Sequence, residues 1–71
     1  TTITYFLPEA TDVTLTVYDR LGREVSVLVS GNQSEGTHSV EFNAESLPSG
    51  IYFYRIKTPL HTEVMKMMLA K

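Results

Sequence analysis

Apolar side chains recur at every second position in six segments of the chain, and this period constrains the fold more than any other feature. The segments are residues 2–7, 12–19, 23–30, 37–43, 51–58 and 62–71. A period of two is the mark of half-buried β-strands, and no segment shows sustained helical spacing. The last segment, "TEVMKMMLAK", contains good helix formers, but its place at the end of an all-strand chain favours a strand.

Turn signals separate these segments. Asp19 opens and Gly22 closes a type I turn, in which we expect a positive φ at Gly22. Pro48 and Gly50 occupy the second and fourth positions of another turn. Short strands at this spacing predict an all-β, antiparallel sandwich of six to seven strands, formed as a single domain by residues 1–71. The expected core includes Leu15, Val17, Val27, Phe42, Tyr54 and Ile56.

The segment "IYFYRIKT" carries bulky apolar residues on both faces at its start. Tyr52, Tyr54 and Ile56 share the face that we expect to point inward, with tyrosine hydroxyls reaching the rim. Ile51 and Phe53 lie on the opposite face, where core packing does not explain them.

Composition excludes several classes of function. The chain has no cysteine, so it forms no disulfide and has no thiolate for catalysis or metal binding. The net charge is −2, and acidic and basic residues are interspersed along the chain. The sequence therefore indicates no positively charged surface for binding nucleic acid. The longest apolar runs, "IYFY" and "MMLA", are far too short for a transmembrane segment. His38 and His61 lack metal-ligand spacing, and no nucleophile elbow is present. We predict no enzyme activity, no cofactor and no metal.

Two alternative binding surfaces remain open at this point. Phe6 and Phe53 could form a platform for sugar stacking, as in a carbohydrate-binding module, although the chain has no tryptophan. The methionines at 65, 67 and 68 could form an adaptable binding surface, although methionine in a terminal strand is more often core filler.

Three stretches together resemble the C-terminal sorting domain of type IX secretion (type A). They are "TTITYFLPEATDVTLTVYDRLGREVSVLV", "EGTHSVEFNAESLPSGIYFYRI" and "TEVMKMMLAK". Their order and spacing match the family over nearly the whole chain, although the Asn-Pro-rich stretch that usually precedes the first strand is not in it. The immunoglobulin-like domain of the flagellar hook-capping protein shares the Tyr-Asp-x-x-Gly-Arg turn and the "SGIYFYR" pattern.

The resemblance implies an immunoglobulin-like or fibronectin III-like sandwich that is the C-terminal fragment of a larger secreted protein. Its function would be non-enzymatic sorting and anchoring: it passes through the periplasm, and the protein reaches the cell surface or the medium. The implied partners are the outer-membrane secretion machinery, a sortase-like peptidase and the fused cargo domain. The alternative is a passive immunoglobulin-like accessory or assembly module of a secreted hydrolase or a hook-cap-like protein.

The family's signal lies towards the C-terminal end. Carried over to this sequence, it points to Gly50 and Tyr52 in "SGIY" and to Lys66 and Lys71 in the last strand. A terminal strand offers free backbone groups for strand addition, and the lysines would add charge. The simpler interpretation is that Lys66 and Lys71 protect an edge strand from aggregation.

Overall fold

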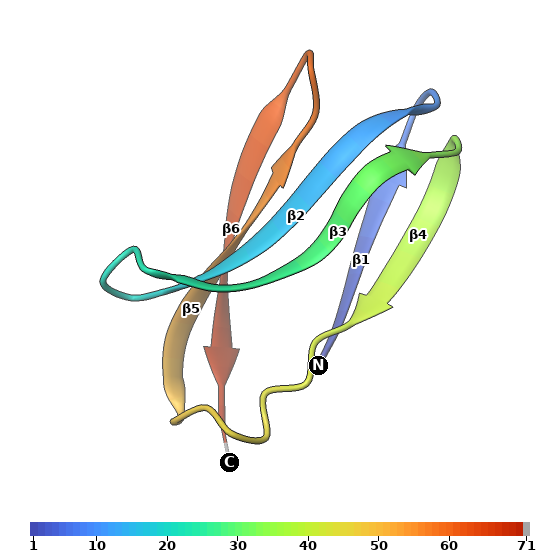
Figure 1. The fold of residues 1–71 in the computed structure, drawn as a ribbon. Helices are drawn as coiled ribbons and strands as arrows, with labels where there is room; N and C mark the ends of the chain where they lie inside the picture. The colour runs from blue at the N-terminus through green and yellow to red at the C-terminus, as the bar shows by residue number, and fades with distance from the viewer. Residues whose placement is uncertain (71) are drawn as a thin grey trace.

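Two antiparallel sheets form a sandwich-like arrangement in the computed structural model, which describes residues 1–70 (Figure 1). One sheet pairs two strands, β1 (Thr2–Leu7) and β4 (Gly36–Glu41). The other has the order β3-β2-β5-β6, formed by Glu24–Gln33, Thr11–Asp19, Gly50–Lys57 and Thr62–Leu69. The predicted all-β sandwich is confirmed with six strands, and the last segment is a strand rather than a helix.

The core lies between the two sheets and is built from alternate residues of the strands. In β1 the odd-numbered residues are buried and the even-numbered residues are exposed, as the period of two predicts. Leu15 and Val17 of β2 are completely buried, and Phe42 is buried directly after β4. These three residues were correctly placed in the core. The buried apolar set is Ile3, Tyr5, Leu7, Val13, Leu15, Val17, Phe42, Tyr52 and Leu69.

The predicted core position of Val27 is wrong, because two irregularities interrupt the pairing of β2 with β3. Leu15 lies opposite Val29 and Thr16 lies opposite Val27, so Leu28 has no partner on β2. An extra residue of this kind is a β-bulge, and it changes which side chains point inward. Val27 is 48% exposed on the outer face, whereas Leu28 packs against the core.

Tyr54 and Ile56 point inward as predicted, but they are only half-buried. The two-stranded sheet faces a four-stranded one, so it cannot cover the whole inner face (Figure 1). The uncovered part lies over β5 and β6, where Met65 is 48% exposed. Tyr54 and Ile56 were expected in the core, and they pack against it as partly buried residues at its margin.

The predicted turn from Asp19 to Gly22 holds β2 and β3 in register, whereas the hydrogen-bonded turn before β5 runs from Ala44 to Leu47 and not through Pro48 to Gly50 as predicted. Gly22 has a φ of +83°, as expected, and its N–H donates to the Asp19 carbonyl over 3.0 Å. The Asp19 carboxylate accepts from the backbone N–H groups of Leu21 and Arg23. The hydrogen bond from the Arg23 N–H is the main cause that lowers the pKa of Asp19 below its ordinary value. This network closes the β2–β3 hairpin.

Candidate functional site

One half of the outer face of the large sheet carries the most distinctive surface of the molecule. Antiparallel pairing places opposite residues of β5 and β6 on the same face. Ile51 therefore lies beside Met68, and Phe53 lies beside Lys66. We call this surface the β5–β6 outer face, and it consists of Ile51, Phe53, Arg55, Lys57, Thr62, Val64, Lys66 and Met68.

The β5–β6 outer face is both apolar and cationic. Ile51 is 38% exposed, Val64 is 59% exposed and Met68 is 71% exposed. Three of its eight residues are lysine or arginine and none is acidic. An apolar surface that excludes acidic residues is suited to a partner surface that is apolar and negatively charged.

Arg55 lies on β5, where the β5–β6 outer face borders β2. Its guanidinium carbon lies 5.3 Å from the centre of the Tyr18 ring, which is within the range of a cation–π contact. Its buried Nε atom donates to no acceptor within residues 1–70. Buried donors are nearly always satisfied in folded proteins, so this one is an exception in the interior of the sheet.

The structure describes three of the four residues that the sequence nominated, and these three do not share one face. Lys66 is exposed on the β5–β6 outer face. Tyr52 lies on the opposite face, is 6% exposed, and donates its hydroxyl hydrogen to the Pro48 carbonyl over 2.8 Å. Gly50 begins β5 with a φ of +149°. Lys71 lies outside the described residues.

This placement divides the nominated residues by their roles in the structure. Gly50 and Tyr52 shape the turn that leads into β5, and only Lys66 is presented on the outer face. Sequence reasoning missed the contribution of Arg55, Val64 and Met68 to the same surface. Alternation shows which residues of one strand share a face, but only the register of β5 with β6 shows which residues become neighbours.

The two phenylalanines proposed as a sugar platform are not brought together. Phe6 is 67% exposed on the outer side of β1, in the two-stranded sheet. Phe53 lies on the outer side of the other sheet, opposite Lys66. The two rings therefore lie on opposite outer surfaces of the sandwich and cannot stack on one sugar.

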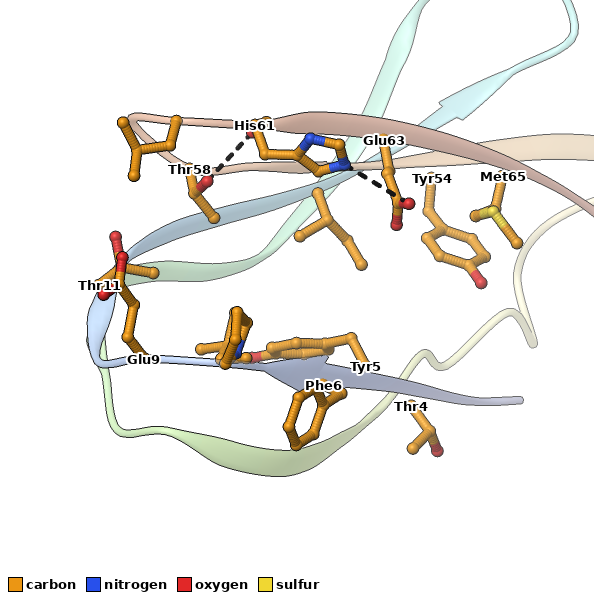
Figure 2. Close-up of a pocket in the computed structure, with 14 residues that line it drawn as sticks. Thr4, Tyr5, Phe6, Glu9, Thr11, Tyr54, Thr58, His61, Glu63 and Met65 are labelled. Carbon is orange, nitrogen blue, oxygen red and sulfur yellow. Dashed lines mark hydrogen bonds and ion pairs between the residues drawn. The ribbon is translucent and has the colours of Figure 1, made fainter.

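A groove of about 450 Å³ opens between β1 and the uncovered inner face of β5 and β6 (Figure 2). Tyr5 lines the β1 side, where its ring stacks on His38 with centroids 5.4 Å apart. Burial raises the pKa of the Tyr5 hydroxyl above its ordinary value. Tyr54 and Met65 line the opposite side.

The histidines of the chain do not form a reactive cluster. His61 lies at the mouth of the groove with its Nε2 atom 3.5 Å from the Glu63 carboxylate (Figure 2). His38 directs its Nε2 atom to the Ser34 carbonyl over 2.7 Å, an arrangement in which the nitrogen donates. Throughout residues 1–70, no three histidine or acidic side chains lie close enough to hold a metal ion.

Comparison with known protein families identifies a family to which the chain is similar. The family described as "Secretion system C-terminal sorting domain" matches residues 1–70. No curated protein and no solved structure matches the chain. Within the part of the chain that is described, no helix is long and apolar enough to cross a membrane.

Proposed function

The chain belongs to the family of secretion system C-terminal sorting domains, and from this premise we propose that it exports a fused cargo protein by presenting its β5–β6 outer face to the type IX machinery. Domains of this family are non-catalytic signals that mark proteins for the cell surface or the extracellular space. The match over residues 1–70 is the observation that carries this proposal.

The β5–β6 outer face supports the choice of recognition surface. A secretion machine that reads a folded domain must use groups on its surface, and this face exposes apolar and cationic groups together. Lys66 lies on the edge strand β6, between the exposed apolar residues Val64 and Met68 on the same face. Protection of an edge strand would need only the charge of Lys66, whereas recognition also needs its apolar neighbours.

Export of a reporter tests this role. The chain is fused to the C-terminus of a periplasmic reporter in a host with type IX secretion, and the reporter is measured in periplasm, surface and medium. Lys66→Glu and Val64→Asp should each reduce export. Arg20→Glu, in the exposed β2–β3 turn, reverses the same kind of charge elsewhere and should leave export unchanged. Reduced export with Arg20→Glu and normal export with Lys66→Glu would contradict the proposed surface.

Folding must be measured for each variant. Surface charge changes usually alter stability by no more than about 0.5 kcal/mol, so circular dichroism should show an intact fold for Lys66→Glu. Deletion of residues 68–71 is a poor test, because Leu69 is 7% exposed and belongs to the core. If every folded variant is exported normally, the passive accessory module becomes the better account.

We also propose that a sortase-like peptidase removes the domain and that the cargo is then released or anchored at the surface. This step rests on the family resemblance alone. The mass of the exported reporter measures it. Loss of the domain's mass supports removal, and an exported fusion of full mass contradicts it.

A further inference from the structure

β1 uses only one of its two edges for pairing. The Phe42 N–H donates to the Thr1 carbonyl over 2.8 Å, and the Thr1 amino group lies 3.4 Å from the Phe42 carbonyl. Thr1 and Phe42 therefore form a hydrogen-bonded pair, and such pairs alternate along an antiparallel ladder. Every second residue after Thr1 is in the same position of the ladder. The backbone groups that bond to β4 are therefore those of Ile3, Tyr5 and Leu7.

The remaining residues of β1 direct their backbone groups the other way. Thr2, Thr4 and Phe6 point their N–H and carbonyl groups at the edge that faces away from β4. Within residues 1–70, no strand pairs with this edge. The groove between β1 and β6 opens directly beside it, and both Thr4 and Phe6 line the groove.

Inward-facing side chains of β5 and β6 form the floor of the groove. Tyr54, Ile56 and Met65 line it from β5 and β6, and all three belong to the inner face that the two-stranded sheet leaves uncovered (Figure 2). A strand added to the free edge of β1 would direct every second side chain onto this floor. The edge would supply backbone hydrogen bonds and the floor would select apolar side chains, which is the usual division in strand addition.

The acidic residues that line the groove determine which charged side chain a bound segment can carry. Glu9 and Glu63 line it, together with His61, and none of its lining residues is lysine or arginine. The β5–β6 outer face, on the other side of the same strands, has the opposite composition. A cationic side chain is therefore favoured in the groove and an anionic one is disfavoured.

We propose that this groove binds an extended segment of another polypeptide, which adds as a strand to the free edge of β1. The segment is apolar at alternate positions, where it covers Tyr54 and Met65, and it carries a lysine or arginine that reaches Glu9 or Glu63. This interaction does not depend on the sorting role, because it uses the inner groove rather than the β5–β6 outer face.

Two other occupants fit less well. A second copy that brought its own β1 edge alongside would also have to place its four-stranded sheet, which is wider than the two-stranded one, beside β6 of the first copy. Residues before Thr1 would continue the ladder past the Thr1–Phe42 pair. They would leave β1 at the end opposite Pro8 and Glu9, which line the groove. They would therefore have to reverse direction to enter the groove.

Hydrogen exchange measured by NMR tests the strand pairing directly. The probe is a short acetylated and amidated peptide of alternating valine and threonine with one lysine. In the free chain, the amides of Thr2, Thr4 and Phe6 should exchange faster than those of Ile3, Tyr5 and Leu7. Saturating peptide should protect the fast set, and the same peptide with alternate amides N-methylated should not. Absence of protection at saturation, or shifts confined to the outer face, would overturn the proposal.

Matched variants test the edge and the charge separately. Thr4→Pro removes a donor on the free edge without removing a bond to β4, so it should weaken peptide binding at least about fivefold. Thr4→Val keeps the N–H and should bind normally. Glu63→Gln should weaken the lysine peptide but not its glutamine analogue, and Glu24→Gln, on another strand, should change neither. Unchanged binding with a folded Thr4→Pro variant, or protection of the same amides by a segment preceding Thr1 in the intact secreted protein, would overturn the proposal.

Discussion

Replacing Val17 and Val27 with alanine, one at a time, tests how the β-bulge divides β3 between the two faces. The change is chemically identical at both positions. Val17 is completely buried, whereas Val27 is 48% exposed. Without the bulge, simple alternation would place both valines in the core, and the two changes would cost about the same.

The expected costs follow from the burial of each side chain. A buried methyl-sized group contributes about 0.8 kcal/mol, and valine has two more than alanine. Val17→Ala should therefore lower the free energy of unfolding by about 2–3 kcal/mol once the cavity is included. Val27 has about half of this area in contact with water already and leaves no enclosed cavity. Val27→Ala should cost at most about 0.8 kcal/mol.

Urea denaturation measures the difference. A domain of this size has a denaturant dependence of about 1 kcal/mol/M, so the midpoint should fall by about 2–3 M for Val17→Ala and by less than about 1 M for Val27→Ala. The dependence itself should stay unchanged, so that the midpoints report stability alone. Equal shifts for the two variants would refute the exposed position of Val27 and the bulge that produces it.

Three further perturbations address the turns and the buried hydroxyl. Gly22→Ala should destabilise the fold by about 1 kcal/mol in thermal melts, because the backbone is left-handed at this position. An added Cβ would meet open space, so backbone strain is the only cost expected. Tyr52→Phe should cost about 1 kcal/mol through loss of the hydroxyl's hydrogen bond, whereas Tyr54→Phe should cost little. The pKa of Asp19 is lowered by folding, so its stabilising contribution is present above the ordinary value of 3.8 and is lost as pH falls through the lower folded-state value. Asp19→Asn should therefore flatten the acid side of a stability–pH curve, and an unchanged curve would contradict this assignment.

Local patterns were sufficient to predict the strands and the β2–β3 turn. Alternation grouped the buried residues of β1 on one face and placed Leu15 and Val17 of β2 in the core, because β1 pairs regularly with β4 and β2 pairs regularly with β5. Gly22 was predictable because a type I turn followed by a left-handed residue favours glycine strongly. These features depend on residues close together in the sequence.

The errors involve long-range pairing. Val27 was misplaced because a bulge depends on how β3 aligns with β2. Tyr54 and Ile56 lie at the margin of the core rather than at its centre, because only two strands cover the inner face of four, and nothing in the sequence indicates this. For the same reason, the groove beside β1 could not be predicted.

The candidate site was predicted only in part. Alternation placed Val64, Lys66 and Met68 on one face of β6, and Ile51 and Phe53 on one face of β5. The register of the two strands was needed to show that these residues form one surface with Arg55. Tyr52 was nominated from the family's pattern, but its burial and its bond to Pro48 indicate a structural contribution.

Export of one fusion in two otherwise identical hosts tests the sorting role most directly. One host has the type IX outer-membrane machinery and the other lacks it, and both express a periplasmic reporter that ends in this chain. The reporter should reach the surface or the medium only in the host with the machinery, and it should remain in the periplasm of the other. Retention in both hosts, while a known sorting domain exports the same reporter, or equal export from both, would contradict the sorting role.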